Sequence, residues 1–265
     1  MTVVAGVAGQ PIAQSLSPVI HGTWIAAAGL DAVYRAFGPA DAAAFADLVG
    51  QGRRGVLRGL NVTAPFKEQA LALADEVAAA ARACGSANLL VFEDGRIRAD
   101  STDGEGLMGA LAEQAPELEV NSRPVVILGA GGAARAAAAA LMAAGAQVGV
   151  LNRTAERARA LADDLGVAVV EAGALGEAAL VVNALSVPPS IDPAALKSEA
   201  VLMDMTYRPL VTPFLAAGRA RGLTTVDGLA MLIGQAKPSF RALFGVEPPD
   251  VDVRRAALAA LGEAE

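Results

Sequence analysis

A glycine-rich segment, GAGGAA at residues 129–134, constrains the fold of this chain more than any other feature of its sequence. It follows the apolar run VVIL and opens an alanine-rich stretch, which is the strand–turn–helix context of the G-x-G-x-x-A dinucleotide fingerprint. The first glycine permits a tight turn, the second lets the backbone approach a pyrophosphate, and the helix N-terminus supplies N–H donors. A purely structural turn is the alternative. We predict that a dinucleotide binds here, against Gly129, Ala130, Gly131, Gly132 and Ala133.

The end of the next predicted strand indicates which dinucleotide binds. NAD enzymes usually place Asp or Glu there, about twenty residues beyond the fingerprint, against the ribose 2′-hydroxyl. This chain has Asn152 and Arg153 instead, and Arg157 lies four residues after Arg153. A carboxylate would repel a 2′-phosphate, whereas a guanidinium binds it through charge-assisted hydrogen bonds of about 1.5–3 kcal/mol each. The sequence therefore favours NADP over NAD, the alternative being that Arg153 is only a solvated residue at a strand end.

Short strand-like runs alternate with alanine- and leucine-rich helical runs along the chain, which predicts an α/β protein. The first hundred residues contain strand-like runs separated by helical ones, and they end in a hairpin that turns at Asp94-Gly95. From Arg123 onward, short apolar runs alternate with helices, as in a parallel sheet covered on both faces. We therefore predict two α/β domains around a cleft: a substrate-binding domain at residues 1–103, to which 228–265 return, and a Rossmann-type, doubly wound nucleotide-binding domain at 104–227.

Composition excludes several classes of partner. The formal net charge is −7, and lysine and arginine form no cluster, so we expect neither nucleic acid nor an anionic membrane as a partner. A single cysteine, Cys84, excludes an intrachain disulfide, and a single histidine, His21, excludes a Cys/His metal cluster. The sequence shows neither a signal peptide nor a run of about twenty apolar residues. We expect a cytoplasmic monomer or homodimer, without a bound metal, that acts on a small molecule.

The segment SLSP in the first domain carries two serines that a core does not require. Ser17 is a suitable helix N-cap, with Pro18 at the first helical position, and capping alone would account for it. Capping does not account for Ser15. Because two hydroxyls beside a helix N-terminus suit a carboxylate, Ser15 and Ser17 are candidates for binding a substrate carboxylate.

Two further polar segments of the first domain contain a lysine and an aspartate. Asn61 and Thr63 lie on one face of a predicted strand end, and Lys67 is expected about one turn into the helix that follows. Asp103 leads into the helix that leaves the domain, and capping that helix is its alternative role. A lysine, whose pKa is ordinarily about 10.4, serves as an acid or base only where burial brings that pKa toward neutrality. A carboxylate has the opposite effect, so we expect Asp103 to position Lys67 and the reacting hydroxyl.

Seven segments resemble shikimate dehydrogenases in their order and spacing, and together they cover nearly the whole chain. They are SLSPVIH, NVTAPFK, STDGEG, GAGGAARA, NRTAERA, DMTYRPLVTP and DGLAMLIGQA. The resemblance implies two α/β domains around a cleft and an oxidoreductase that acts on a CH–OH group. It implies the reversible, NADP-dependent reduction of 3-dehydroshikimate, or of a close analogue, within chorismate and aromatic amino acid biosynthesis.

The resemblance also implies roles for residues at matching positions. Lys67 matches the family's catalytic lysine and Asp103 its partner, so Lys67 would accept the proton of the reacting hydroxyl while hydride leaves for the nicotinamide. Ser15 and Ser17 match the pair that binds the carboxylate. The other matching residues are Asn61, Thr63, Asn88 and Gln235 with Asp103 for the ring hydroxyls, Tyr207 for the substrate, Met205 and Gly228 for the nicotinamide end, and Asn152, Arg153 and Thr154 for the 2′-phosphate.

Four positions depart from the family pattern. Leu89 and Leu185 stand where threonine is usual, Ser101 where asparagine is usual, and Gly22 where an asparagine follows the histidine. The two leucines remove hydroxyls near the expected cleft, and losing one polar contact to a sugar-like ring costs about 1 kcal/mol or more. A paralogue that acts on quinate, an aminoshikimate or another cyclic hydroxy acid therefore stays open.

Two other functional classes fit part of the pattern. A non-catalytic NADP-binding sensor would tolerate the altered contacts, but it has no need of both Lys67 and Asp103. A methylene-tetrahydrofolate dehydrogenase shares the layout at the level of fold, but the paired serines and the Gln235 segment favour a hydroxy acid. The enzyme that acts on a cyclic hydroxy acid is the function that the sequence favours.

Three residues are expected to serve structure. We expect His21 to be a hydrogen-bonded structural residue, and Trp24, on the same helix face, to pack on the core of the first domain. Asp204 is expected to end a strand and to fix the turn that follows it.

Overall fold

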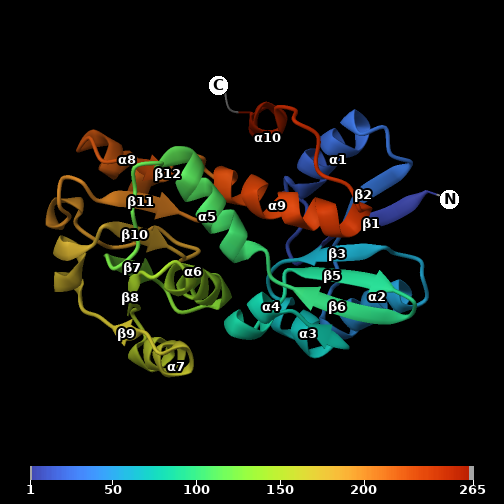
Figure 1. Ribbon diagram of the computed structural model, residues 1–265, viewed down its shortest axis with the longest axis horizontal. Helices are drawn as coiled ribbons and strands as arrows, with labels where there is room; N and C mark the ends of the chain where they lie inside the picture. Colours follow the sequence, from blue (N-terminus) through green and yellow to red (C-terminus); the bar gives the residue numbers. More distant parts are fainter. Residues whose placement is uncertain (1, 263–265) are drawn as a thin grey trace. The chain divides into compact units, whose positions relative to one another are not determined.

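The computed structural model describes residues 2–262, which form two compact units (Figure 1). Unit 1 contains the residues up to Thr102 and those from Gln235 onward, and unit 2 contains Asp103–Gly234. The divisions fall at 102/103 and 234/235, compared with predicted boundaries at 103/104 and 227/228. The second division lies within helix α9 (Gly228–Phe244), so this helix contributes residues to both units.

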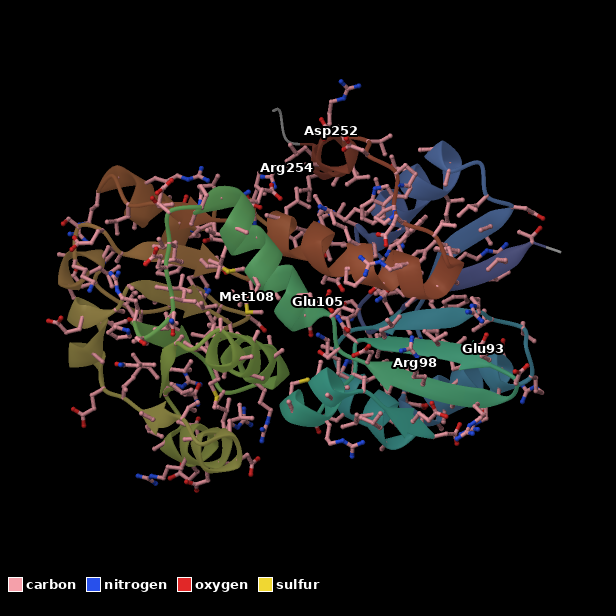
Figure 2. All side chains as sticks on the ribbon, in the orientation of Figure 1. Glu93, Arg98, Glu105, Met108, Asp252 and Arg254 are labelled. Atoms are coloured by element: carbon pink, nitrogen blue, oxygen red, sulfur yellow. The ribbon has the colours of Figure 1, made fainter. Side chains whose placement is uncertain are left out.

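The sheet of unit 1 is mixed. Within residues 2–262 it has six strands in the order β2-β1-β3-β5-β6-β4, and β5 alone runs antiparallel to its neighbours. The predicted hairpin joins β5 to β6, and its turn residues Asp94 and Gly95 have φ values of 49° and 74°. Glu93 and Arg98 of this hairpin are exposed (Figure 2). The strands are β1 (Val3–Ala8), β2 (Ala32–Phe37), β3 (Gly59–Val62), β4 (Glu76–Val77), β5 (Leu89–Glu93) and β6 (Arg96–Asp100).

Helices cover both faces of the unit 1 sheet. On one face, Phe45 packs with Leu60 and Val62 of β3 in a hydrophobic cluster. The alternate residues of β3 point toward α9, since a Cβ on Gly59 would lie 2.3 Å from Leu243 Cδ2. The helices are α1 (Ser17–Ala27), α2 (Ala42–Arg53), α3 (Lys67–Ala72), α4 (Ala79–Cys84), the second part of α9, and α10 (Val253–Leu261).

The sheet of unit 2 is parallel and covered on both faces, as predicted. Among the described residues it has six strands in the order β12-β11-β10-β7-β8-β9, and each neighbouring pair is parallel. Alternate residues of the central strand β7 enter two separate cores: Val125 and Ile127 enter one, Val126 and Leu128 the other. This is the doubly wound arrangement of dinucleotide-binding folds.

The elements of unit 2 alternate along the chain between strand and helix. Its strands are β7 (Pro124–Leu128), β8 (Gln147–Leu151), β9 (Ala168–Val169), β10 (Leu180–Asn183), β11 (Val201–Asp204) and β12 (Thr225–Val226). Its helices are α5 (Asp103–Gln114), α6 (Gly132–Ala143), α7 (Ala155–Leu165), α8 (Pro213–Ala220) and the first part of α9, with 3₁₀ turns η1 (Ala172–Glu177) and η2 (Pro193–Ala195). None of the described helices has the length and apolar character needed to span a bilayer.

Candidate active site

Polar residues of unit 1 gather at one edge of its sheet. Strands β1, β3 and β6 end at this edge, and β5, which runs in the opposite direction, begins there. Asn61 lies near the end of β3, Asn88 directly precedes β5, and Thr102 follows β6 by two residues. The topology therefore brings together segments that are far apart in the sequence.

Asn88, Thr102 and Gln235 form a buried hydrogen-bond network at this edge. Asn88 Nδ2 donates to Thr102 Oγ1 at 3.0 Å and to Gln235 Oε1 at 3.1 Å. Thr102 N donates to Asn88 Oδ1 at 2.8 Å, and Thr102 Oγ1 donates to Gln235 Oε1 at 3.2 Å. All three side chains are buried, where an unpaired polar group is costly, so the network holds each amide in one orientation.

Asn61 is hydrogen-bonded to the same network and to two residues that the sequence analysis did not identify, Tyr34 and Ser239. Asn61 Nδ2 donates to Asn88 O at 3.1 Å and to Ser239 Oγ at 2.9 Å. Asn61 Oδ1 accepts from the Tyr34 hydroxyl at 2.7 Å. Ser239 lies one helical turn after Gln235 on α9, and this i,i+4 spacing is the sequence signal that could have found it. Tyr34 carries no comparable signal, because its contact depends on the pairing of β1 with β2 and β3.

Thr63 follows β3 at the same edge, where the end of β1 passes close to it. A Cβ on Gly9 would lie 2.3 Å from Thr63 Cγ2, so a larger residue at position 9 would displace Thr63. Thr63 N also donates to Ala8 O at 2.9 Å, which joins the two segments through the backbone. Gly9 therefore permits the loop after β1 to approach Thr63.

The two serines of the first polar segment are arranged differently from the prediction. Ser17 is the first residue of α1 and not its N-cap, and within the described chain no side chain caps this helix. Ser15 Oγ instead accepts from Ser17 N at 3.3 Å. The side chain of Ser17 is buried and hydrogen-bonds to Tyr34. Capping therefore does not account for Ser17, and its hydroxyl belongs to the same buried network as Asn61.

Two aromatic residues of unit 1, His21 and Tyr34, stack on each other beside this network. The rings of His21 and Tyr34 stack with centroids 4.0 Å apart. Burial raises the pKa of Tyr34 well above its ordinary value of 10.0, against the smaller, opposing effect of the Ser17 hydrogen bond. The Tyr34 hydroxyl therefore stays protonated and remains a hydrogen-bond donor.

His21 differs from the prediction in its hydrogen bonding. It is completely buried, and neither ring nitrogen has a partner among the described residues, so the expected hydrogen bond is wrong. Burial lowers its pKa to about 3, which keeps the ring neutral at physiological pH. Trp24 does pack in the core as predicted, with its ring 5.8 Å from that of His21.

Lys67 and Asp103 each begin a helix. Lys67 is the first residue of α3, one turn earlier than predicted, and its side chain is half-buried. Lys67 O accepts from Ala87 N at 3.0 Å, next to Asn88 in the network. Asp103 is buried, begins α5 and unit 2, and directly follows Thr102 along the chain. The backbones at Lys67 and at Thr102 are therefore both hydrogen-bonded to the segment Ala87–Asn88.

The predicted pyrophosphate turn in unit 2 lies between β7 and α6. Gly129 has a φ of +119°, a conformation that favours glycine, and Gly131 is the N-cap of α6. No side chain caps α6, and a Cβ on Gly131 would meet nothing within 4 Å among the described residues. Ala134 is completely buried against the sheet, as the fingerprint requires. Uncapped N–H groups and open space beside Gly131 fit a pyrophosphate.

The predicted 2′-phosphate loop follows β8 in the same unit. Asn152 Nδ2 donates to Thr154 O at 2.9 Å, which shapes the loop. Arg153 and Arg157 are exposed, and within the described part of the chain no carboxylate pairs with either. Arg135, by contrast, forms an ion pair with Asp164. Two guanidinium groups without a counter-charge fit a bound phosphate dianion.

The segment after β11 brings together the residues predicted for the nicotinamide end. Asp204 ends β11 and accepts from Thr206 N at 2.9 Å and from Thr212 Oγ1 at 2.7 Å, so it fixes the turn as predicted. A Cβ on Gly228 would lie 2.6 Å from the backbone of Thr206 and 2.7 Å from that of Met205. Gly228 therefore permits the backbone of Met205 and Thr206 to pack directly on the start of α9.

The positions that depart from the family pattern have different surroundings. Leu89 is buried and pairs with Asn61 between β3 and β5. Leu185 lies beside the pyrophosphate turn, since a Cβ on Gly129 would be 3.2 Å from Leu185 Cδ2. Ser101 is buried next to Thr102, and a Cβ on Gly22 would contact none of the described residues. The two leucines therefore lie next to predicted site residues.

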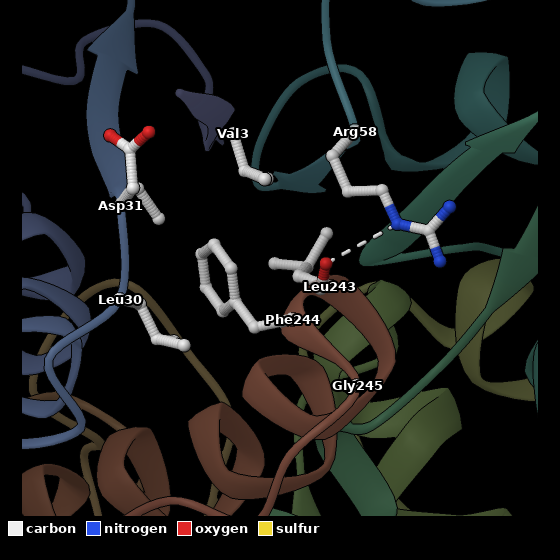
Figure 3. Close-up of a pocket in the computed structure, with 8 residues that line it drawn as sticks. Val3, Leu30, Asp31, Arg58, Leu243, Phe244 and Gly245 are labelled. Atoms are coloured by element: carbon white, nitrogen blue, oxygen red, sulfur yellow. Dashed lines mark hydrogen bonds between the residues drawn. The ribbon is translucent and has the colours of Figure 1, made fainter. Parts of the chain in front are cut away.

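A hollow of about 530 Å³ in unit 1 lies apart from these residues (Figure 3). Its walls include Val3, where β1 begins, whereas the polar network lies where β1 ends. Arg58 Nε donates across it to Leu243 O at 3.3 Å. None of the predicted site residues lines this hollow, so it does not contribute to the candidate site.

Comparisons with known proteins agree along the chain. The family model described as shikimate dehydrogenase substrate binding domain matches residues 7–90, and the one described as shikimate / quinate 5-dehydrogenase matches residues 110–201. A protein named shikimate dehydrogenase (NADP(+)), from Caulobacter vibrioides (strain NA1000 / CB15N), is 54% identical over 276 residues. That alignment covers 98% of this chain and 96% of the relative.

Solved structures show the same similarity. The shikimate 5-dehydrogenase of Thermus thermophilus, in complex with NADP(H) and shikimate, aligns with a TM-score of 0.91 and 36% sequence identity, covering 98% of this chain and 100% of that one. The quinate dehydrogenase of Corynebacterium glutamicum, in complex with NAD, aligns with a TM-score of 0.88 and 31% identity, covering 98% and 99%.

Proposed function

The chain belongs to the shikimate dehydrogenase family, and from this premise we propose that it catalyses the reversible, NADP-dependent reduction of 3-dehydroshikimate to shikimate. The observation that carries the proposal is the network of Asn61, Asn88, Thr102 and Gln235, because clustered amides and hydroxyls suit a ligand with several ring hydroxyls. The enzyme is an oxidoreductase that acts on a CH–OH group. Its reaction belongs to chorismate and aromatic amino acid biosynthesis.

In this proposal one unit binds the substrate and the other binds the cofactor. Unit 1 binds the substrate, which the match of residues 7–90 to the family's substrate binding domain supports. Unit 2 would bind NADP(H), which the uncapped N-terminus of α6 supports. The enzyme is a cytoplasmic monomer or homodimer, and size-exclusion chromatography with light scattering distinguishes the two assemblies.

Bound NADP(H) supplies or accepts the hydride. The turn Gly129–Gly131 and the first N–H groups of α6 hold its pyrophosphate, since a helix N-terminus favours anions. Arg153 and Arg157 bind the 2′-phosphate, supported by their exposure and by the absence of a carboxylate partner among the described residues. Met205 and Gly228 would contact the nicotinamide end of the cofactor, which their packing against each other supports.

Lys67 is the general acid and base. In the direction of reduction its ammonium group donates a proton to the substrate oxygen as hydride reaches the adjacent carbon. In the direction of oxidation its amine accepts that proton from the hydroxyl. Asp103 orients the lysine and the reacting hydroxyl. The hydrogen bond from Ala87 N to Lys67 O supports this role, because it ties the start of α3 to the polar network.

The remaining predicted residues bind the non-reacting groups of the substrate. Ser15 and Ser17 bind the carboxylate, and the burial of Ser17 beside Tyr34 supports a role other than capping. The ring hydroxyls are bound by Asn61, Thr63, Asn88, Asp103 and Gln235, and Tyr207 contacts the substrate.

Quinate is the second candidate substrate. Leu89 argues for a cyclic hydroxy acid other than shikimate, because this buried leucine lies opposite Asn61 where the family usually has a hydroxyl. The structural similarity to a quinate dehydrogenase at 31% identity is consistent with such a change. The 54% identity to a relative named for shikimate and NADP(+) favours shikimate.

One assay distinguishes these functions. The purified protein is incubated with NADP or NAD and with shikimate, quinate or an aminoshikimate, while the absorbance of the reduced nicotinamide is recorded. We expect the highest kcat/KM with shikimate and NADP. A higher kcat/KM with quinate would establish the second candidate, and no reduction with any substrate would indicate a non-catalytic NADP-binding protein.

A further inference from the structure

Tyr34 connects two residues that the proposed function assigns to different groups of the substrate. Its hydroxyl donates to Asn61 Oδ1 at 2.7 Å, and the side chain of Ser17 hydrogen-bonds to the same phenol. Ser17 serves the substrate carboxylate and Asn61 a ring hydroxyl. Because all three side chains are buried, water does not compete for these bonds, and the two binding residues are held at a set distance from each other.

Strand pairing dictates where the Tyr34 side chain points. Ala5 of β1 pairs with Tyr34 on one side and with Gly59 on the other, and Val7 pairs with Asn61. Paired residues of parallel strands point to the same face, and so do residues two apart on one strand. Tyr34 and Asn61 therefore lie on the same face of the sheet. Helix α9, which carries Ser239, covers that face.

The amide of Asn61 has most of its hydrogen-bonding capacity committed inside the protein. A side-chain amide has two N–H donors and an oxygen with two lone pairs. Both donors are used, by Asn88 O and Ser239 Oγ, and one lone pair accepts from Tyr34. Rotating the amide by 180° would place its oxygen against the carbonyl oxygen of Asn88, which cannot donate. Among the described residues, only the second lone pair of Asn61 Oδ1 has no partner, so Asn61 can still accept one hydrogen bond and cannot donate another.

We propose that Tyr34 and Ser239 are positioning residues that hold Asn61 as a hydrogen-bond acceptor only, so that the substrate group facing it must be a donor. This inference rests on the proposed function, because it concerns the same substrate. A ring hydroxyl satisfies the requirement, whereas a fluorine or an ether oxygen at the same carbon does not. Asn61 thus selects for a hydroxyl by its polarity as well as by its position.

The first arm of the test needs no substrate. Hydrogen exchange of side-chain amides is measured by NMR, with the exposed Asn121 as the internal reference. We expect the Asn61 amide to exchange much more slowly than that of Asn121, and to exchange faster in Ser239→Ala and Tyr34→Phe. Thr23→Val is the control, since it removes a hydroxyl of α1 that donates to Val19 O outside the network.

Global stability is separated from the local effect in the same spectra. If a variant speeds the exchange of the β3 backbone amides as well, that common increase reports overall unfolding. Only an increase in the exchange rate of the Asn61 side chain beyond that of the backbone amides reports the local effect. If the Asn61 amide exchanges as fast as that of Asn121 in the wild-type protein, the inference is overturned whatever the substrate is.

The second arm uses shikimate analogues in which one non-reacting hydroxyl is replaced by hydrogen or by fluorine. We expect the fluoro analogue at the position facing Asn61 to be used as poorly as the deoxy analogue, with kcat/KM lowered about fivefold or more. Asn61→Ala should abolish the difference in kcat/KM between shikimate and the two analogues at one ring position. That position carries the hydroxyl that faces Asn61. Tyr34→Phe, which keeps the ring against His21, should weaken the discrimination at that position and raise KM about fivefold with kcat little changed.

The outcomes separate the inference from the function on which it rests. If the wild-type protein does not oxidise shikimate, the proposed function fails, and the exchange experiment still decides the amide geometry. If shikimate is oxidised but the fluoro analogue performs as well as shikimate at every position, no substrate hydroxyl needs to donate to Asn61 and the inference is wrong. If Tyr34→Phe changes neither the KM nor the difference in kcat/KM between shikimate and its fluoro analogue, Tyr34 has only a structural role and does not position Asn61.

Discussion

The ring of His21 lies flat against the ring of Tyr34, with their centroids 4.0 Å apart and their planes parallel. Phe240 of α9 approaches the same imidazole at 5.9 Å and Trp24 at 5.8 Å. Since neither nitrogen of His21 has a partner among the described residues, the imidazole acts as an aromatic surface. It supports the phenol that in turn holds Asn61 and Ser17.

The first prediction concerns the pH dependence of stability. In the unfolded chain His21 titrates near its ordinary pKa of 6.5, but in the folded protein burial lowers that pKa to about 3. Between these values the unfolded state binds one more proton, so the free energy of unfolding falls as the pH falls. From pH 7.5 to 5.5 the loss is about 1.4 kcal/mol, and it is absent at pH values well above 6.5.

Urea denaturation of the wild-type protein and of His21→Phe at several pH values measures this effect. The variant keeps an aromatic ring in the cluster and lacks the titrating group, so its free energy of unfolding should fall less between pH 7.5 and 5.5. The same pH slope in both proteins would contradict a buried, neutral His21.

The second prediction concerns Lys67. Lys67→Ala should lower kcat about a hundredfold to ten-thousandfold, the usual worth of general acid and base assistance. The affinity for NADP, measured by fluorescence titration, should be nearly unchanged. Lys237→Ala removes an exposed lysine of α9 and should leave kcat unaffected. Normal turnover in Lys67→Ala would exclude it as the acid and base.

The third prediction concerns the choice of cofactor. Arg153→Ala should raise the KM for NADP about tenfold to a hundredfold, because a charge-assisted hydrogen bond to the 2′-phosphate is lost. The KM for NAD, which lacks this phosphate, should change little. Arg159→Ala, an exposed arginine on α7, is the matched control. A preference of the wild-type protein for NAD would show that this loop does not read the phosphate.

The fourth prediction concerns the open space beside the pyrophosphate turn. A Cβ on Gly131 meets nothing within 4 Å of the described chain, and its φ of −96° is accessible to any residue. Gly131→Ala should therefore leave the melting temperature of the unliganded protein unchanged. Affinity for NADP should fall about tenfold, because the added methyl group occupies the space that the pyrophosphate needs. Unaltered affinity, measured by calorimetric titration, would place the pyrophosphate elsewhere.

The fifth prediction concerns Gly228, which contrasts with Gly131. A Cβ here would lie 2.6 Å from the backbone of Thr206, and backbone cannot move aside without a wider change. Gly228→Ala should lower the free energy of unfolding by about 1–3 kcal/mol. Gly173→Ala in η1, where a Cβ meets none of the described residues, is the control. Equal stability of the two variants would show that Met205 and Thr206 are loosely packed against Gly228.

Local patterns predicted the fold class well. The parallel sheet of unit 2 and the β5–β6 hairpin could be predicted because a strand buried on both faces is uniformly apolar and a tight turn needs Asp-Gly chemistry. Element boundaries were less accurate, as Ser17 and Lys67 show by beginning their helices. The first residue of a helix depends on backbone hydrogen bonds that side-chain pattern specifies only loosely.

Residues that are neighbours along the chain were enough to predict the α/β architecture, the glycine turn and the arginines beyond it. The shared hydrogen-bond network of Asn61, Asn88 and Gln235, and its completion by Tyr34 and Ser239, could be seen only once the chain was folded. The alternation of side chains along a strand indicates which face of the sheet each side chain occupies. It does not indicate which other strand pairs with that strand. That pairing is settled when β1 aligns β2 with β3, which places Tyr34 and Asn61 on the same face of the sheet.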